Sequence, residues 1–335
     1  MSYNNSKISN KNYYSLSQAL NKIFYTFGKK RKIIYDLFYI TLAFGFYQKI
    51  SGSILVFLIS KYSYKLYNNN NFIRFFLFSG IRKISIENIF KIRNNYFKSF
   101  EDNVIEDPVY EKIILEIREK GFCDITKLIN ISDEDIENVI AHYKANDFYD
   151  GHEPMQSSFK KMRYSDLKNY SASHEIFNKG YYSPSTQVSL DNSVIKNLFN
   201  NIHFQKLSSL YCGFETKGYL LHTMLNIIKE GVHPVTQYHR DTNDFVDLGF
   251  FIYWTDTDKN NGATTYQEGS HRSLNGDFKS NILEVPKGSI IAGDWMGLHK
   301  GNAKLDSSQE RFLTVMRYGK KINQSHIQSK SYYFL

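Results

Sequence analysis

Cysteine is scarce in this chain of 335 residues, which contains only Cys123 and Cys212. Two cysteines exclude a small domain held together by disulfides and a zinc site built from several thiolates. The sequence instead favours two buried, small apolar side chains in a reducing compartment. Residues 1–21 are polar and lack the apolar segment of a cleavable signal peptide, so we expect a cytoplasmic protein.

Acidic residues are almost missing from residues 1–100, where Asp36 and Glu87 accompany sixteen lysines and arginines. This part carries a net charge of +14, whereas residues 101–335, with 26 basic and 31 acidic residues, carry −5. A basic arm beside a mildly acidic body indicates an anionic partner for the arm. A recognisable nucleic-acid-binding module is also lacking, and the arm is more apolar than typical basic arms, so no nucleic-acid partner is expected.

A long uninterrupted apolar run is missing as well, because Gln48 and Lys49 interrupt the most apolar stretch, residues 37–60. Its length just reaches the roughly 20 residues of a membrane span, but a lysine near the middle argues against a simple span. Two interpretations stay open for residues 21–100. They form buried helices packed on the rest of the protein, which the interruption favours. Alternatively they contact an anionic membrane surface, to which the basic cluster at 29–32 is suited, and hold the protein peripherally there.

Composition divides the chain into three parts. Residues 1–20 are polar, rich in Asn and Ser, and are expected to form a flexible N-terminus. Residues 21–102 are basic and apolar with helical spacing, which predicts a basic helical region. An acidic segment containing Pro108 then begins a domain over residues 103–335.

The domain over residues 103–335 begins with helical patterns and continues with strands. "VYEKIILEIREKGF" has helical spacing and ends near Gly121, "ISDEDIENVIAHYKAN" has Ser132 as its N-cap, and a third helix begins near Asp191. From Gly218 onward, short apolar or alternating runs are separated by Gly, Pro, Asn and Asp. The pattern predicts an α+β domain whose strands form a sandwich, jelly roll or barrel, with the helices outside one sheet.

The stretch "TQYHRDTND" contains His239 and Asp241, separated by one residue. Alternate side chains on a strand share a face, so this pair can hold two adjacent corners of a metal ion. A third ligand is sought in His271 of "QEGSHRS" or His299 of "GDWMGLHKGN". Two histidines and one carboxylate leave three octahedral positions open, as expected of a non-haem Fe(II) site. Alone, the pair is weak evidence, and an ordinary polar strand end is the alternative.

Arg311 follows His299 by twelve residues and opens the strand-like segment "RFLTVMRY". The turn-rich connection "KGNAKLDSSQE" between them allows two antiparallel strands, which would bring Arg311 within reach of the metal face. A planar guanidinium binds a carboxylate through two hydrogen bonds and so suits a dicarboxylate cosubstrate. The alternative for Arg311 is a structural ion pair.

Five features occur in a particular order along the chain. They are "HTML" (222–225), "HRD" (239–241), "YWTDTDKNNGATTYQEGSH" (253–271), "KGSIIAGDWMGLHKGN" (287–302) and Arg311. In this order they resemble the phytanoyl-CoA dioxygenase family of Fe(II)- and 2-oxoglutarate-dependent oxygenases. The resemblance covers about residues 219–318, is weak over 105–218 and is absent from 1–100. It implies a double-stranded β-helix (jelly roll, cupin-like) catalytic core with flanking helices.

The resemblance also implies roles for single residues. His239, Asp241 and His299 resemble the ligands of Fe(II). Arg311 resembles the residue that pairs with the far carboxylate of the cosubstrate 2-oxoglutarate. His271 lies in a turn that usually shapes the pocket without binding the metal.

Further positions match the cosubstrate pocket of the family or depart from it. Met224 and Trp254 match positions that line this pocket, although such residues on strands more often belong to the core. The family often has a hydroxyl residue where this chain has Gly301, so one hydrogen bond to the cosubstrate is either missing or comes from Thr264, Thr265 or Ser308. Arg240 stands where Gln is common, points away from the metal and is expected to be neutral for the site.

The implied activity is hydroxylation of an unidentified small-molecule, lipid or glycan-related substrate with dioxygen, releasing succinate and CO2. Asp241 favours hydroxylation, or less often desaturation or epimerisation, because related halogenases lack the carboxylate and bind halide in its place. A nucleotide-binding loop that would indicate coenzyme A is not found. Residues 150–190 either cover the mouth of the pocket or form a surface insertion. Two alternatives are a catalytically degenerate jelly-roll binding protein tethered to a membrane by its basic N-terminal helices, and a zinc or manganese cupin-like enzyme.

Overall fold

The structure is a computed structural model of the chain and divides into two compact units. One unit comprises Met1–Asn103 with Ile322–Ile327, and the other comprises Val104–Lys321 with Gln328–Leu335. The structure describes residues 86–100, 104–150, 161–167, 181–226, 237–241, 246–302, 310–319 and 331–333.

The first unit is described only at helix α5 (Ile86–Lys98) and the two residues after it. The expected flexible N-terminus, the apolar stretch 37–60 and the basic cluster at 29–32 all lie outside the described residues. Among the helices of the described ranges, none has the length and apolar character needed to cross a membrane.

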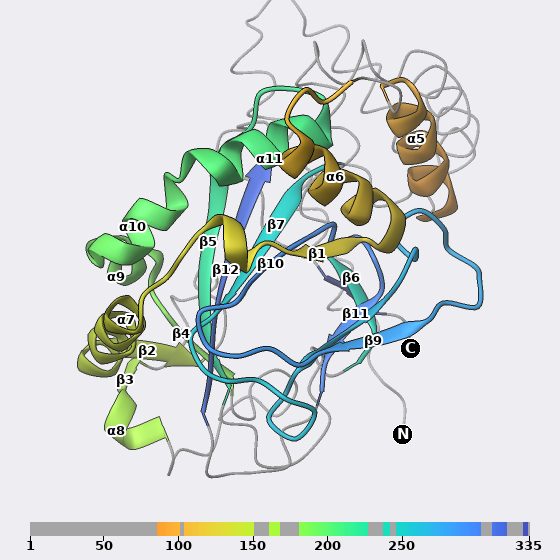
Figure 1. Ribbon diagram of the computed structural model, residues 1–335. Helices are drawn as coiled ribbons and strands as arrows, with labels where there is room; N and C mark the ends of the chain where they lie inside the picture. Colours follow the sequence, from red (N-terminus) through yellow and green to blue (C-terminus); the bar gives the residue numbers. More distant parts are fainter. Residues whose placement is uncertain are drawn as a thin grey trace, which may run out of the picture. The chain divides into compact units, whose positions relative to one another are not determined.

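Eight strands of the second unit form a jelly roll (Figure 1). Their bounds are β5 (Lys217–Asn226), β6 (His239–Asp241), β7 (Leu248–Tyr253), β8 (Thr264–Gln267), β9 (Ser280–Leu283), β10 (Ile290–Gly293), β11 (His299–Gly301) and β12 (Arg311–Gly319). One antiparallel sheet has the order β10-β7-β12-β5, and the other has the order β6-β11-β8-β9. The chain crosses from sheet to sheet at every step except the β8–β9 pair, which is the double-sheet arrangement of a jelly roll. The predicted α+β jelly-roll architecture is therefore confirmed for this unit.

Five further strands extend the two sheets. They are β1 (Phe122–Asp124), β2 (Asp147–Asp150), β3 (Lys161–Arg163), β4 (Tyr181–Pro184) and β13 (Ser331–Tyr333). Strand β1 pairs with β10, while β4, β2 and β3 continue the same sheet beyond β5. Strand β13 pairs with β6 in the smaller sheet.

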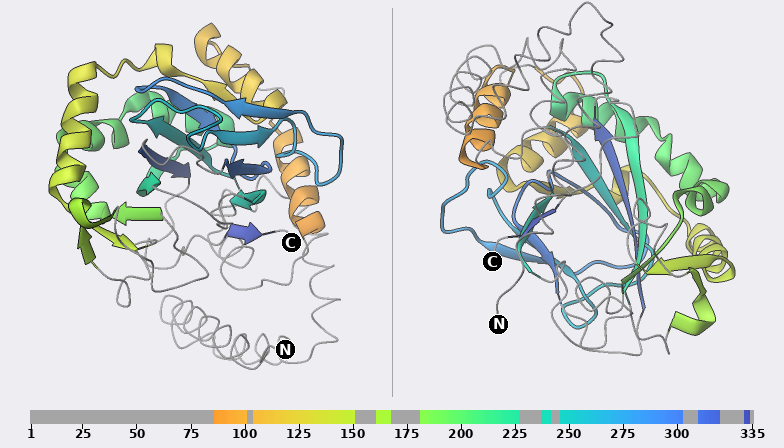
Figure 2. Two further views of the ribbon diagram at one scale, coloured as in Figure 1. Left: turned by 90° about the horizontal axis from the view of Figure 1, so that it is seen from below. Right: turned by 180° about the vertical axis from the view of Figure 1, so that it is seen from behind.

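Helices of the second unit flank the larger sheet (Figure 2). They are α6 (Pro108–Lys120), the short 3-10 helix η3 (Thr126–Leu128), α7 (Asp133–Ala145), α8 (Tyr164–Leu167), α9 (Thr186–Asp191), α10 (Ser193–Phe199) and α11 (Ile202–Cys212). Helix α6 ends at Gly121 with φ of 99°, and Ser132 begins α7 in a reciprocal capping box, as expected. The helix predicted from Asp191 is instead two helices, because the side chain of Asn201 accepts a hydrogen bond from the His203 amide and starts a new one.

Strand β12 separates the interior of the jelly roll from the helical layer. Leu313 and Val315 belong to the interior cluster of apolar side chains, together with Trp295. On the other face, Phe312 stacks on Tyr143 of α7 with ring centroids 6.3 Å apart. Because alternate residues share a face, the two arginines of β12, at positions 311 and 317, also point into the interior.

Candidate metal and cosubstrate site

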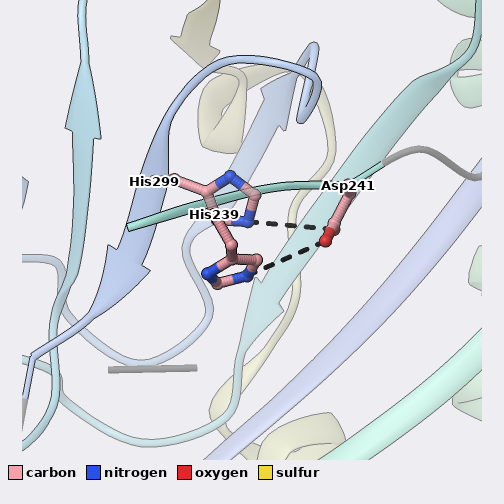
Figure 3. Close-up of side chains that lie close together, drawn as sticks. All are labelled: His239, Asp241 and His299. Carbon is pink, nitrogen blue, oxygen red and sulfur yellow. Dashed lines mark ion pairs between the residues drawn. The ribbon is translucent and has the colours of Figure 1, made fainter. Parts of the chain in front are cut away.

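Two histidines and one aspartate converge where β6 and β11 lie side by side. His239 and His299 are directly opposite in the antiparallel register, with ring centroids 4.3 Å apart. The Nε2 atom of His239 lies 3.8 Å from Oδ1 of Asp241, and Nε2 of His299 lies 3.8 Å from its Oδ2 (Figure 3). Among the residues that the structure describes, this is the one group of at least three His, Cys, Asp or Glu side chains whose donor atoms lie within 4.8 Å of one another.

Backbone carbonyl groups set the orientation of both imidazole rings. His239 Nδ1 lies 2.8 Å from the carbonyl oxygen of Gln237, and His299 Nδ1 lies 2.9 Å from that of Gly297. A carbonyl oxygen can only accept, so each Nδ1 carries the hydrogen and each Nε2 keeps its lone pair. Burial of His299, followed by the charge of His239, lowers the pKa of His299 to about 3, so its ring is neutral near pH 7.

This donor set fits a divalent metal ion such as Fe(II). Neighbouring ligands of an octahedral ion with bonds of about 2.1 Å lie about 3 Å apart. The observed separations of 3.8 Å therefore require only a small inward movement of the side chains. Two imidazoles and one carboxylate are the ligands of the 2-His-1-carboxylate type, which leaves three positions open.

The turn before β11 is anchored by Asp294. Its side chain accepts hydrogen bonds from Tyr211 Oη at 2.5 Å and from the Met296 amide at 3.1 Å. Its carbonyl oxygen accepts a hydrogen bond from Tyr266 Oη at 2.6 Å. The next residue, Trp295, accepts from the backbone amide of Asp241 at 2.9 Å. The same turn therefore positions both His299 and one end of β6.

Arg240 points away from the metal ligands, as expected, but it is not neutral for the site. Its side chain is buried, and Nη1 donates to the carbonyl oxygens of Ser270 at 2.5 Å and Met296 at 2.8 Å. Nη2 donates to the carbonyl oxygen of Ser273 at 3.2 Å. Arg240 thus ties the Gly-Ser-His turn to the segment that leads into β11.

His271 lies in that turn and does not join the metal ligands. Its Nε2 atom lies 3.1 Å from the carbonyl oxygen of Arg118 at the end of α6. The neighbouring Ser270 accepts from the Leu298 amide at 2.7 Å and donates to the Gln267 carbonyl oxygen at 2.6 Å. Of the two candidate third ligands, the structure brings His299 to the pair and leaves His271 as part of the supporting turn.

Arg311 lies in the interior near the triad and is 4% exposed. Its Nη2 donates to Thr264 Oγ1 at 2.9 Å. Thr264 pairs with Gly301 in the β8–β11 register, two positions from the pair of Tyr266 and His299. Two strand residues span about 7 Å. Because the Arg311 guanidinium contacts Thr264, it lies roughly one side-chain length from His299 and the other candidate metal ligands.

The Asn-Gly turn lies against this arginine. Gly262 has φ of 91°, a conformation that glycine adopts without strain. The Asn261 side chain donates to the Asp256 carbonyl oxygen at 2.8 Å and accepts from the Asp258 amide at 2.6 Å, which fixes the turn. A Cβ atom at Gly262 would lie 3.4 Å from Cδ of Arg311, so the turn forms a wall around the guanidinium.

Thr264 is better placed than Thr265 to supply the hydroxyl that Gly301 lacks. The two threonines point to opposite faces of β8, and Thr265 donates to Asn302 Oδ1 at 2.9 Å. Thr264 instead contacts Arg311 and accepts a hydrogen bond from Tyr253 Oη at 3.1 Å. The third candidate, Ser308, lies outside the described residues.

Met224 and Trp254 lie on different faces of the larger sheet. Met224 is opposite Leu313 in the register and packs against the interior cluster. Trp254 is fully buried and donates from Nε1 to Thr314 Oγ1 at 2.7 Å, on the face of β12 that meets the helices. Trp254 therefore lies in the layer between sheet and helices, not beside Arg311, which corrects its expected place in the cosubstrate pocket.

Three residues around Asp241 were not predicted from the sequence. Arg317 Nη2 donates to Asp241 Oδ2, and its Nη1 lies 3.3 Å from Asp247 Oδ2. Tyr219 Oη in turn donates to Asp247 Oδ2. A usable signal was present, because an arginine six residues after Arg311 in a strand must share its interior face.

Comparisons with known proteins give structural similarities only; no protein family model and no curated protein matches this sequence. The epimerase SnoN, solved with Fe3+, α-ketoglutarate and nogalamycin RO, has a TM-score of 0.47 and 13% identity over 64% of this chain and 85% of its own. AviO1 from Streptomyces viridochromogenes Tue57 has a TM-score of 0.44 and 14% identity over 68% of this chain and 100% of its own. HygX from Streptomyces hygroscopicus, solved with nickel and 2-oxoglutarate, has a TM-score of 0.41 and 12% identity over 62% of this chain and 86% of its own. Similarity at this level does not assign an activity, so the case for function depends on the site residues.

Proposed function

We propose that this chain is an Fe(II)- and 2-oxoglutarate-dependent dioxygenase similar to the phytanoyl-CoA dioxygenase family. We further propose that it hydroxylates a small-molecule, lipid or glycan-related substrate. The observation that carries the proposal is the convergence of His239, Asp241 and His299 in one jelly roll, with Arg311 on the same interior. A binding protein without catalytic activity would have no need of this combination of two imidazoles, a carboxylate and a buried guanidinium.

Each residue has a defined task in the proposed enzyme. His239 and His299 offer their Nε2 lone pairs and Asp241 offers a carboxylate oxygen to the metal ion. Arg311 binds the far carboxylate of 2-oxoglutarate, with the Thr264 hydroxyl beside it. Met224 lies on the interior face of β5, directly opposite Leu313 of the neighbouring strand β12, where it can line the space for the cosubstrate. Burial of both histidines and of Arg311 keeps bulk water away from these groups.

The bound iron would supply the oxidising chemistry, in which 2-oxoglutarate and dioxygen give succinate and CO2 and one oxygen atom enters a C–H bond of the substrate. The protein's own contribution is to bind, orient and enclose. Asp241 occupies the position at which related halogenases bind halide, so its presence favours hydroxylation. We also propose a cytoplasmic enzyme whose basic arm either packs as helices or contacts an anionic membrane; most of residues 21–100 lie outside the described ranges.

Formation of succinate tests the proposal. The full-length protein is prepared without oxygen, loaded with Fe(II), and supplied with 2-oxoglutarate and air, with succinate measured by mass spectrometry. We expect succinate that depends on both iron and 2-oxoglutarate, and its loss in Asp241→Asn, which preserves side-chain volume but removes the charge. Thermal unfolding of the variant is measured alongside to show that it folds. Absence of 2-oxoglutarate binding to the iron-loaded wild type would instead support the degenerate binding protein.

A further inference from the structure

We propose that Arg317 is a positioning residue which, held by Asp247 and Tyr219, fixes the carboxylate of Asp241 for metal binding. The inference rests on the metal centre of the proposed function and adds a supporting layer of three residues to it. None of the three is needed to complete the triad, and each acts through Asp241.

The contacts form one continuous chain from the protein interior to the metal ligand. Tyr219 Oη donates to Asp247 Oδ2, which lies 3.3 Å from Arg317 Nη1. The other terminal nitrogen of the same guanidinium, Nη2, donates to Asp241 Oδ2. The carboxylates of Asp247 and Asp241 are therefore held by the two terminal nitrogen atoms of one planar, rigid guanidinium group.

Burial gives this chain of contacts its strength. Arg317 is 1% exposed, Asp247 is 2% exposed and Tyr219 is 9% exposed. A buried guanidinium needs carboxylates to compensate its charge, and loss of Arg317 would leave Asp247 as an uncompensated buried charge. Asp247 compensates this charge separately, which leaves the negative charge of Asp241 available to a metal ion.

Neighbouring strands provide the space for the Arg317 side chain. Arg317 is opposite Gly249 of β7, where an added Cβ would overlap Trp295 and would lie 3.4 Å from Cδ of Arg317. On its other side Arg317 pairs with Leu220 of β5. The Arg317 side chain therefore passes over Gly249 and extends from the larger sheet to Asp241, which belongs to the smaller sheet.

Asp241 depends on such support because of its place in the chain. It is the last residue of the three-residue strand β6, and its backbone amide is held by the Trp295 carbonyl oxygen at 2.9 Å. The side chain is more exposed than those of the two histidines, at 19%. With Oδ2 engaged by Arg317, the oxygen left for a single metal bond is Oδ1, which lies 3.8 Å from His239 Nε2.

Cobalt binding to the metal-free, full-length protein tests the inference without any assay of activity. Co(II) is titrated without oxygen, and its visible absorption bands report both affinity and coordination. We expect Arg317→Met to weaken Co(II) binding roughly 10- to 100-fold, as is usual when a group that orients a metal ligand is lost. Thr314→Val is the control, because it removes a buried polar group from the helical face of the same strand, where Thr314 accepts a hydrogen bond from Trp254 Nε1. We expect its Co(II) affinity to equal that of the wild type.

A milder pair of variants covers the case in which Arg317→Met does not fold. Tyr219→Phe removes one hydroxyl that is three contacts away from Asp241, and we expect a roughly two- to tenfold weaker Co(II) affinity. Tyr143→Phe is its control, since Tyr143 is also buried but its hydroxyl bonds Ser189 and Thr223 in the helical layer. We expect Tyr143→Phe to leave the affinity and the absorption bands unchanged.

The outcomes separate this inference from the proposed function. If the wild type binds Co(II) while Tyr219→Phe and Arg317→Met bind it equally well or more tightly, the positioning role of Arg317 is refuted and the metal centre stands. If the wild type itself does not bind Co(II), the metal centre fails, and the proposed function and this inference fail with it. Equal weakening in each variant and its control would also refute the inference, because it would show a general effect of lost packing.

Discussion

Replacement of Gly297 by alanine should damage both the fold and the metal site. Gly297 precedes β11 by two residues, and its carbonyl oxygen orients the His299 ring through the 2.9 Å contact with Nδ1. Its φ is not positive, so the backbone itself tolerates alanine. An added Cβ, however, would overlap the Oη and Cζ atoms of Tyr266 and lie 3.0 Å from its Cε1 atom.

The size of the effect follows from what Tyr266 must give up. Tyr266 is fully buried, and its hydroxyl donates to the Asp294 carbonyl oxygen at 2.6 Å. Forcing a methyl group into such a core costs about 1–3 kcal/mol, and loss of the hydrogen bond adds about 1 kcal/mol. For a unit of this size, a total of about 2–4 kcal/mol lowers the melting temperature by about 4–16 °C.

Thermal unfolding and Co(II) titration of Gly297→Ala measure the two consequences. Gly276→Ala serves as the control, because there the added Cβ approaches only the Phe278 ring, at 3.0 Å, in an exposed turn. We expect a clear fall in melting temperature and in Co(II) affinity for Gly297→Ala alone. A Gly297→Ala variant with the melting temperature of the wild type would show that Tyr266 moves freely and that the turn before β11 does not hold His299.

Two further predictions concern charge. Arg311→Lys should weaken binding of 2-oxoglutarate to the oxygen-free, Co(II)-loaded protein roughly 10- to 150-fold, since a charged hydrogen bond of about 1.5–3 kcal/mol is lost. Calorimetric titration measures this affinity. An unchanged Kd would contradict the role assigned to Arg311. Burial first, then His239, lowers the pKa of His299 from 6.5 to about 3. Between those pH values the unfolded chain takes up a proton at His299 that the folded chain does not, so the free energy of unfolding of the metal-free protein falls as the pH falls, by up to about 1.4 kcal/mol per pH unit. Urea unfolding of the wild type and of His299→Gln between about pH 7 and about pH 5 should give a shallower dependence for the variant, and equal slopes would contradict the lowered pKa.

The strand-rich pattern of the domain and the shared face of His239 and Asp241 follow from local patterns in the sequence, whereas the jelly roll and the choice of His299 over His271 came from the order of motifs that carries the family resemblance. Alternation along "HRD" puts His239 and Asp241 on one face whatever surrounds them. The turns that precede β8 and β11 contain glycines whose positions are visible in the sequence, and the distal histidine follows one of these turns. These features depend on neighbours a few residues apart, so they are predictable.

The positions of Thr264 and Trp254 were harder to obtain from the sequence. Adjacent residues in a strand point in opposite directions, so a choice between Thr264 and Thr265 requires the register of β8 against β11. Trp254 follows the last residue of β7, and only its hydrogen bond to Thr314 shows which face it joins. The spacing of Arg317 from Arg311 shows which face of the strand it shares, but its partner Asp241 is 76 residues away in the sequence, so the contact between them could not be predicted.

Strand β12 has a consequence for how such a pocket can change. Arg311 and Arg317 are six residues apart on one continuous strand, with register kept against β5 over that length and against β7 from Leu313 onward. Their Cα atoms are thus separated by about 20 Å, set by the rise of a strand. Strand β12 therefore fixes the distance between Arg311, the proposed cosubstrate anchor, and Arg317, the proposed support of Asp241. Insertion of a single residue between the two arginines would turn one of them to the helical face and so separate the two proposed roles.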